Sequence, residues 1–597
     1  MRNDLPVPSK PSATRWGSDY IADVMRALGI EYIALTPGAS YRGLHDSLVN
    51  HLGNAKPGML LALHEESAVA IAHGYAKITG KPLGVLLHSN VGLMHASMAI
   101  FNAWCERVPM LLYGGNGPMD ANARRPFVDW QHTSTDQAAL VRHYLKWDNQ
   151  PASLPAAAEA MLRAAQIAQT APCAPTYVIF DAALQEVKIE GTLRVPDVER
   201  FRPPQPAYPA PDVVQAVVAM LAKAKRPLLL AGRGGRGIAA WKNRIALAEL
   251  LGARVLTSLR TSAAFPSSHP LHAGPPIKFV DEATIKTVAQ SDVILSLDWI
   301  ELAGLLKQAW QSAPVAAKVI QVSVDVQVHN GWGMEHLGLP PADINVLAEP
   351  DAFTAALLAE LRKTRRKRSA SRALIRRGDE VRPQPKLSAK GSIGVRTLAS
   401  AINTIAAQQD TCLIRVNLGW PADMTIYNHP LDYLGGDGGG GVGAGPGMTV
   451  GAALALRDLY GKGRLPLAVL GDGDFMMGVS ALWTATHYKI PLLMVIANNR
   501  SFFNDEMHQE RIARQRGRPV ENKWIGQRFA GPNLDIAALA RAQGAIAFGP
   551  VARAGNLLKT LRDAVAKTRA GNVVVVEVLV NAEYDSTIAN SMVRGSQ

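Results

Sequence analysis

The stretch from Leu467 to Phe502, LAVLGDGDFMMGVSALWTATHYKIPLLMVIANNRSF, constrains the fold of this chain more than any other. A short apolar run ends at Gly-Asp-Gly, a helix-like segment follows, and a second apolar run ends on two asparagines. Buried strands joined by one helix indicate a βαβ unit and a parallel sheet. Because the crossover is right-handed, both strands end at the same edge of the sheet. We therefore expect Asp472 and Asn499 to lie close together.

The polar residues at these two strand ends are suited to bind a metal ion and a diphosphate. Ligands of parallel sheets bind beyond the carboxyl ends of the strands. Glycines let the backbone approach an anion, and N–H groups at a helix start favour phosphate. A carboxylate and an amide oxygen can hold Mg²⁺ while phosphate oxygens and water fill its other positions. A tight turn followed by an unrelated pair of asparagines is the structural alternative.

The same alternation of strand-like and helix-like segments recurs in three blocks along the 597 residues. It predicts an α/β fold with three doubly wound parallel-sheet domains. A Pro-rich connector, RFRPPQPAYPAP, follows the first block, and a basic stretch follows the second. The expected boundaries are residues 1–190, residues 205–362, a basic linker at 363–390, and residues 391–597.

The net charge of +14 does not point to nucleic acid. Between Arg362 and Lys386 lie eleven Lys or Arg residues and two acids, which is +9 of the +14 in one stretch. Such a block is typical of a solvated linker or helix end, and it lacks the interleaved aromatic residues of a nucleic-acid groove. We expect no nucleic-acid partner.

The composition also argues against membrane insertion and secretion. No apolar run approaches the length of a membrane span, and the first residues contain no apolar stretch typical of a secretory signal. The three cysteines lie far apart and form no metal pattern. These observations predict a cytoplasmic protein with reduced thiols.

The Gly-Asp-Gly motif, followed after 24 residues by Asn-Asn, resembles the signature of thiamine diphosphate (ThDP) enzymes. The phrase SALWTATHYKIP is similar to benzoylformate decarboxylase and its acetolactate synthase relatives. The resemblance implies ThDP and Mg²⁺ as cofactors, with Asp472, Asn499 and the backbone carbonyl of Ser501 as metal ligands. Gly473 and Asp474 would belong to the same cofactor-binding loop.

The resemblance extends over nearly the whole chain. It implies a pyrimidine-binding domain, a central domain and a diphosphate-binding domain, in that order. It also implies a homodimer or homotetramer in which ThDP lies between the first domain of one subunit and the third domain of its partner.

The segment LALHEESAVAIAHGYAKITGKP resembles the part of the family that carries the glutamate which activates ThDP. Counting back nine residues from Gly74 selects Glu65 rather than Glu66. The implied role of Glu65 is a hydrogen bond to the aminopyrimidine, so that the cofactor's own imino group acts as base. A glutamate at a helix start can also serve only as a partner of the helix dipole.

Three further segments resemble cofactor-binding parts of the family. In GGDGGGGVGAGPGMTVGAALAL, Val442 takes the bulky position beneath the bent cofactor, and Gly443 and Ala444 would meet the aminopyrimidine through their backbone. In LTPGASYRGLHD, Pro37 and Gly38 match the loop over the aminopyrimidine ring. In the segment NLGW at 417–420, a looser match implies that Gly419 and Trp420 contact the diphosphate.

The substrate side combines features of two relatives. His88 matches a proton-handling histidine of benzoylformate decarboxylase, with His73 and His95 as further candidates. Gln131 matches a catalytic-site glutamine of acetolactate synthases, and its neighbour His132 is a candidate substrate contact. We therefore expect a ThDP-dependent lyase or transferase that makes or breaks a C–C bond next to the carbonyl of a 2-oxo acid or acyloin, as a decarboxylase or a carboligase.

Alternative activities remain open at the level of the sequence. They are an FAD-linked oxidase similar to pyruvate oxidase, a 1,2-diketone hydrolase, and a non-catalytic regulator with a ThDP fold. The GRGGRG turn at 232–237 could approach a nucleotide, although a glycine turn after a strand is the commoner meaning. FAD is therefore left open without direct support.

Overall fold

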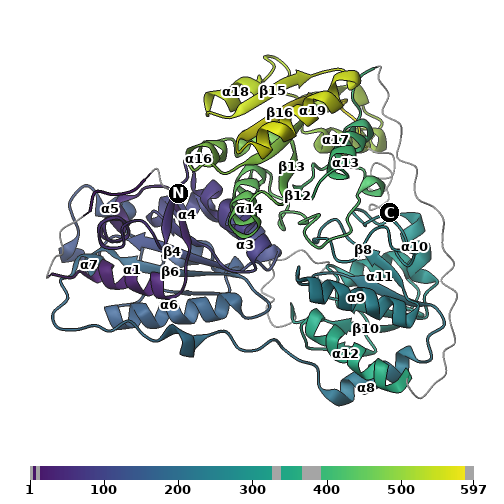
Figure 1. Cartoon of the computed structure of the whole chain (residues 1–597), viewed down its shortest axis with the longest axis horizontal. Helices are drawn as coiled ribbons and strands as arrows, with labels where there is room; N and C mark the ends of the chain where they lie inside the picture. The colour runs from purple at the N-terminus through teal and green to yellow at the C-terminus, as the bar shows by residue number, and fades with distance from the viewer. Residues whose placement is uncertain (1–3, 9–13, 326–337, 366–390, 585–597) are drawn as a thin grey trace.

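Three parallel sheets follow one another along the chain, and helices cover both faces of each (Figure 1). The computed structural model describes residues 4–8, 14–325, 338–365 and 391–584. The expected α/β fold with three doubly wound parallel sheets is confirmed. The basic stretch predicted as a linker lies outside the described residues from 366 to 390, whereas Lys363 still belongs to a helix.

The first sheet has the strand order β2-β1-β3-β4-β6-β5. Apolar residues alternate between its faces, as the two-residue period of a strand requires: Ile33 and Leu35 pack on one layer, and Ala34 packs on the other. Its strands are β1 (Tyr32–Leu35), β2 (Gly58–Leu61), β3 (Gly84–Leu87), β4 (Met110–Asn116), β5 (Trp147–Asn149) and β6 (Pro175–Asp181). Its helices are α1 (Gly17–Ala27), α2 (Arg42–Asp46), α3 (Glu65–Thr79), α4 (Ser89–Cys105), α5 (Asp129–His132), α6 (Leu154–Gln169) and α7 (Ala182–Glu186).

The central sheet has the order β11-β10-β9-β7-β8 and two apolar layers. Its strands are β7 (Pro227–Ala231), β8 (Arg254–Thr257), β9 (Val293–Leu297), β10 (Lys318–Val322) and β11 (Ile344–Val346). Its helices are α8 (Pro211–Leu221), α9 (Ile238–Leu251), α10 (Glu282–Ala289), α11 (Leu302–Trp310) and α12 (Pro350–Arg365).

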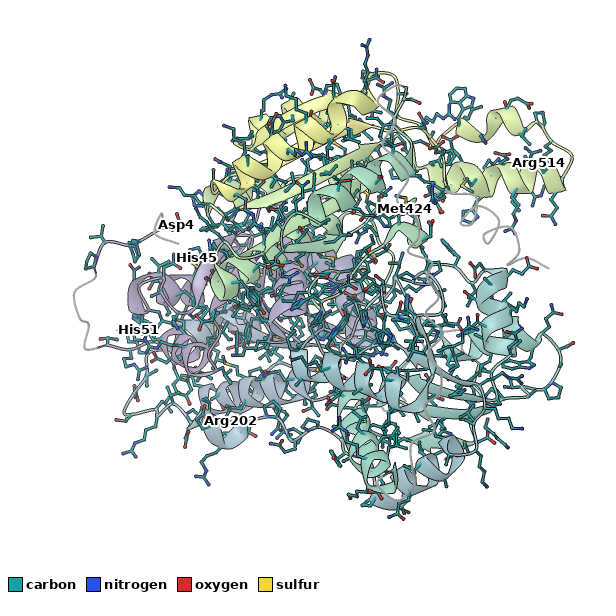
Figure 2. The ribbon with its side chains drawn as sticks, turned by 45° about the vertical axis from the view of Figure 1, so that its right-hand side comes forward. Asp4, His45, His51, Arg202, Met424 and Arg514 are labelled. Carbon is teal, nitrogen blue, oxygen red and sulfur yellow. The ribbon has the colours of Figure 1, made fainter. Side chains whose placement is uncertain are left out.

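The third sheet has the order β12-β13-β14-β16-β15. Its strands are β12 (Thr411–Arg415), β13 (Leu465–Gly471), β14 (Leu492–Asn498), β15 (Ile546–Val551) and β16 (Val573–Leu579). Its helices are α13 (Val395–Ala406), α14 (Ala444–Tyr460), α15 (Asp472–Met477), α16 (Ala481–His487), α17 (Phe503–Gln515), α18 (Ile536–Ala542) and α19 (Ala554–Arg569). Helix α17 and the short turn after it project from this unit, with Arg514 on the projection (Figure 2).

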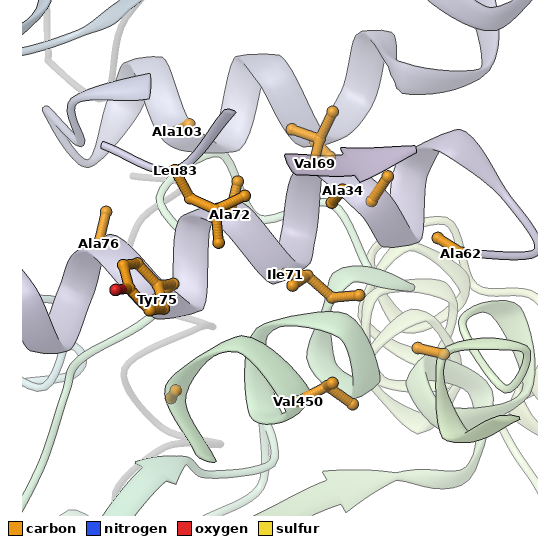
Figure 3. Close-up of a cluster of buried hydrophobic side chains, with 14 of the residues drawn as sticks. Ala34, Ala62, Val69, Ile71, Ala72, Tyr75, Ala76, Leu83, Ala103 and Val450 are labelled. Atoms are coloured by element: carbon orange, nitrogen blue, oxygen red, sulfur yellow. The ribbon is translucent and has the colours of Figure 1, made fainter. Parts of the chain in front are cut away.

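Helix α3 of the first unit packs directly on α14 of the third unit, and the contact is built on glycines. A Cβ on Gly74 would lie 2.0 Å from the carbonyl oxygen of Met448, and one on Gly451 would lie 1.8 Å from that of Ile71. Bare glycine surfaces on both helices therefore let the two backbones meet. Figure 3 shows Ile71 and Val450 within the buried cluster at this crossing, which joins the cores of both units.

The end of helix α3 is set by a glycine. Gly80 follows the helix with φ +68°, a left-handed conformation that glycine adopts without strain. The helix begins at Glu65, the residue that the resemblance assigns to cofactor activation.

The cysteines and the hydropathy of the helices agree with the composition of the chain. All three cysteines are free thiols. Within the part of the chain that the structure describes, no helix combines the length and the apolar character needed to cross a bilayer.

Candidate cofactor site between the first and third units

The ends of β13 and β14 bring the predicted metal ligands together. The two strands pair in parallel, with Gly471 opposite Ala497, so that Asp472 and Asn499 follow at the same edge. The Asp472 carboxylate accepts a hydrogen bond from the backbone N–H of Arg500 at 2.6 Å and one from that of Gly473 at 2.8 Å. The crossover argument from the sequence thus leads to the observed arrangement.

The electrostatics of Asp472 are suited to a cation. Its side chain is buried, and burial raises the pKa of Asp472 to about 6 although backbone N–H groups of Gly473 and Arg500 oppose the shift. Among the described residues, no ion pair includes this carboxylate. A divalent ion would therefore supply the positive charge that the buried Asp472 carboxylate lacks.

The two asparagines at the end of β14 have different surroundings. Asn498 is buried and donates to Glu577 at 2.8 Å, which makes it part of the fold. Asn499 lies at the edge, and its Oδ1 accepts from the backbone N–H of Ser501 at 3.0 Å. This hydrogen bond orients the amide oxygen of Asn499 and the segment of Ser501, the two groups expected to complete the metal site.

The glycine-rich turn before α14 lies against the same loop. Gly443 has φ +110°, and its N–H donates to Asp474 Oδ1 at 2.7 Å. The N–H of Gly445 donates to the same oxygen at 3.2 Å, and Ala444 begins the helix. Val442 is 41% exposed beside them, so this bulky apolar side chain is free to support a bound ring, as the sequence predicted.

Asp474 therefore organises the turn, a role that the motif did not reveal. Its second oxygen pairs with Nε of Arg415 at 3.1 Å, and the same guanidinium pairs with Asp437 at 2.5 Å. All three residues are buried or nearly so. Arg415 was not among the predicted site residues; a charged residue at the end of the apolar strand CLIRV is the signal that could have indicated it.

Two adjacent carboxylates begin α3 and point to different neighbours. Glu65 is buried, and its Oε2 lies 3.0 Å from Nδ1 of His95. Glu66 faces the glycine turn: a Cβ on Gly443 would lie 3.3 Å from its Oε1. Burial, and then the charge of Asp474, raises the pKa of Glu66. The start of α3 thus lies beside the third unit of the same chain.

A pair of imidazoles lies beside Glu65. The rings of His88 and His132 are 4.8 Å apart, and Nδ1 of His88 lies 2.9 Å from Oγ of Ser40. Burial, and then His132, lowers the pKa of His88, while the Glu65 carboxylate opposes the shift. Nδ1 of His132 is buried and has no hydrogen-bond partner among the described residues. Gly38 fits closely here, since a Cβ would lie 2.3 Å from His88.

Other predicted residues are less clearly part of this site. Pro37 is exposed in the loop after β1. Gln131 is exposed; its backbone N–H donates to the carbonyl of Val128 at 3.2 Å, and its own carbonyl accepts from the Asn90 amide at 3.5 Å. The indole of Trp420 is buried in the core and donates to Thr425 at 3.0 Å, so only its backbone could contact a ligand.

The loop after β12 is contacted by two residues that the sequence did not suggest. Lys278 of the central unit donates to the carbonyls of Leu418 and, at 3.3 Å, Asn417. Burial, and then two nearby arginines, lowers the pKa of Lys278 to about 7. A Cβ on Gly419 would lie 3.0 Å from the ring of Tyr584, which therefore covers this loop.

The GRGGRG turn is filled by the protein itself. The N–H of Gly235 donates to the carboxylate of Asp351 at 2.6 Å, and Arg233 pairs with Asp325. A carboxylate already occupies the position that a nucleotide phosphate would need, so this turn gives no support to an FAD site.

Comparison with known proteins places this geometry in context. Three family models match the chain in order: thiamine pyrophosphate enzyme, N-terminal TPP binding domain at residues 15–140, the central domain at 214–353, and the C-terminal TPP binding domain at 417–578. The three matches follow the order of the three sheets, although β5, β6 and β12 lie outside the matched ranges.

Individual relatives span most of the chain at low identity. Acetolactate synthase isozyme 1 large subunit of Escherichia coli K12 is 25% identical over 504 residues, which is 81% of this chain and 82% of the relative. Benzoylformate decarboxylase of Pseudomonas aeruginosa is 26% identical over 462 residues, covering 74% and 79%. The crystal structure of benzoylformate decarboxylase from Polynucleobacter necessarius superposes with a TM-score of 0.75 at 21% identity, over 96% of this chain and 99% of that one.

Proposed function

The chain belongs to the thiamine pyrophosphate enzyme family, and on that basis we propose that it is a Mg²⁺-dependent enzyme that decarboxylates a 2-oxo acid. Thiamine pyrophosphate is another name for ThDP. The relatives include decarboxylases and acetolactate synthases, so the chain is a ThDP-dependent decarboxylase or carboligase.

The observation that carries the proposal is the convergence of two sets of groups. Asp472 and Asn499 lie at adjacent strand ends of the third unit, and Glu65 and Glu66 begin a helix of the first unit that packs on α14. The glycine turn at Gly443 lies between them. This convergence supports the proposal that the strand ends would hold a metal-bound diphosphate while a carboxylate of α3 would meet the ring.

ThDP supplies, when bound, a carbanion at its thiazolium C2 that adds to a carbonyl carbon. The residues of this chain bind and orient it: Asp472, Asn499 and the carbonyl of Ser501 would hold Mg²⁺, and Val442 would support the bent cofactor from below. Glu65 would hold a proton at the aminopyrimidine nitrogen, a task suited to a carboxylate shielded from water.

The imidazole pair favours decarboxylation with return of a proton. His88 is partly buried, its pKa is lowered, and Ser40 fixes its ring orientation. Because burial lowers the pKa of His88, its imidazole is neutral at neutral pH and can relay a proton between its two ring nitrogens. His132, with a free buried nitrogen, supplies a second polar contact for the carboxylate of the substrate.

A carboligase that resembles acetolactate synthase is the second candidate. It is supported by the matching segment around Gln131, whose exposed side chain is free to contact an acceptor. The two activities differ only in whether a proton or a second carbonyl compound takes up the acyl anion equivalent.

The deciding experiment is incubation of the purified protein with ThDP, Mg²⁺ and a panel of aromatic and aliphatic 2-oxo acids, with and without an aldehyde. Release of carbon dioxide together with the free aldehyde supports the decarboxylase. Acyloin or acetohydroxy acid formation at the expense of free aldehyde supports the carboligase. Absence of both, with ThDP bound, would contradict the proposal.

The proposal includes a homodimer or homotetramer with active sites shared between subunits, and a mixing experiment tests it. Glu65→Gln and Asp472→Asn subunits are co-expressed with different tags, and the mixed oligomer is isolated. If sites join two subunits, one intact site forms and activity returns. If each site is made within one chain, as the packing of α3 on α14 would also allow, the mixed oligomer stays inactive.

A further inference from the structure

The start of α3 carries a second set of possible metal ligands, separate from the strand-end pair. His64, Glu65 and His95 each offer one ligand atom, and these atoms lie within 4.8 Å of one another. Nδ1 of His95 lies 3.0 Å from Oε2 of Glu65. His64 and His95 have ring centroids 5.1 Å apart and an interplanar angle of only 22°.

The geometry leaves room for an ion to enter. Glu65 is buried, His64 is partly buried, and the side chain of His95 is 59% exposed. An ion bonded at about 2.0–2.2 Å to three ligands holds their donor atoms roughly 3.3–3.5 Å apart. His95 lies on α4, and rotation of its exposed ring can adjust its nitrogen to these distances without moving the backbone of either helix.

The chemistry of these donors selects a particular class of ion. Two imidazoles and one carboxylate suit Zn²⁺ and its neighbours Co²⁺, Ni²⁺ and Cu²⁺, whereas Mg²⁺ prefers oxygen ligands alone. Three protein ligands with an open fourth position are typical of an accessible site. The strand-end pair of Asp472 and Asn499, by contrast, offers only oxygen atoms and so suits Mg²⁺.

We propose that His64, Glu65 and His95 form an inhibitory site for a transition-metal ion, Zn²⁺ foremost, that competes with activation of the cofactor. The competition rests on the function proposed above, because a metal-bound Glu65 carboxylate cannot carry the proton that it would hold at the aminopyrimidine nitrogen. Zinc bound here occupies the carboxylate that activation needs and leaves the Mg²⁺ site untouched.

The first test measures binding without turnover. The chelator-treated, untagged full-length protein is titrated with Co²⁺, whose tetrahedral complexes absorb visible light. We expect an absorption band that Zn²⁺ removes and Mg²⁺ does not. His95→Gln should weaken Co²⁺ binding at least about tenfold. His269→Gln is the matched control: it also removes a histidine that lies beside a glutamate, Glu249 at 3.3 Å, in the central unit, and it should leave the band unchanged.

The second test measures inhibition of the enzyme. Zn²⁺ should lower turnover at saturating ThDP and Mg²⁺, and His95→Gln should raise the Zn²⁺ concentration needed for half-inhibition about tenfold or more. No Co²⁺ band, or a band equal in wild type and His95→Gln, would overturn the site. A band without any effect of Zn²⁺ on turnover would overturn the competition, and would count against Glu65 as the activating residue while leaving ion binding established.

Discussion

The glycine crossing of α3 and α14 leads to a quantitative prediction for Gly451→Ala. The added Cβ would lie 1.8 Å from the carbonyl oxygen of Ile71, whereas ordinary contacts begin at 3.4 Å. The difference, 3.4 − 1.8, means that the helices must separate by about 1.6 Å. The obstacle is a backbone atom of a packed helix, so no side chain can turn aside to make room.

Two opposing effects set the size of the loss. Alanine in place of glycine favours the helix itself by about 1 kcal/mol. Overpacking costs about 1–3 kcal/mol and more where the backbone must move, so we expect a net destabilisation of about 2 kcal/mol. Thermal unfolding of the apoprotein, followed by circular dichroism, should show a Tm lowered by about 4–8 °C, using the 2–4 °C per kcal/mol typical of large domains.

The crossing also holds the start of α3 beside the glycine turn, so Gly451→Ala should raise the Kd for ThDP. Gly274→Ala is the matched control, since a Cβ there meets no atom within 4 Å. If Gly451→Ala unfolds at the temperature of the control and binds ThDP as wild type does, the close approach of the two helices has been misjudged.

The remaining predictions concern individual side chains. Glu65→Gln should retain ThDP but slow turnover at least about a hundredfold, whereas Glu66→Gln should cost much less; equal losses in kcat would contradict the assignment. Asp472→Asn should abolish Mg²⁺-dependent ThDP binding in a fluorescence titration. Because the pKa of Asp472 in the apoprotein is about 6, its ionised fraction falls from about 90% at pH 7 to about 10% at pH 5, so Mg²⁺ should bind about tenfold more weakly at pH 5. A profile no steeper than that of Mg²⁺ with free ThDP would refute this. His88→Ala should lower kcat more than ThDP affinity, and His132→Ala should chiefly raise KM for the 2-oxo acid; an unchanged rate for both would remove the pair from the mechanism.

Much of the fold follows from local sequence patterns. The two apolar runs of the stretch Leu467–Phe502 form β13 and β14, and the helix-like segment between them forms α15 and α16, as the pattern predicted. The adjacency of Asp472 and Asn499 followed from one topological rule, because a right-handed crossover leaves little freedom. Strands β2, β5, β6, β11 and β15 were not predicted. Four of them are short or only partly buried and carry a weak apolar signal. The buried strand β6, PTYVIFD, has a clear apolar run that the prediction missed.

Contacts between distant segments could not be predicted in the same way. Nothing local to Glu66 indicates that it faces Gly443, because that contact depends on how two sheets are placed through one helix crossing. The pairing of Arg415 with Asp437 and Asp474 is likewise a property of the assembled third unit. His95 could be noted only as a histidine on a helix until the structure placed it against Glu65.

Asp474 gives the two ends of the site a common mechanical support. It stands two residues after Asp472, yet its carboxylate anchors the amides of Gly443 and Gly445. A displacement of the metal-binding loop is therefore transmitted to the turn that would cradle the ring. Binding of the cofactor's diphosphate should therefore rigidify the glycine turn that would bind its ring. We expect the two parts of the cofactor to bind cooperatively.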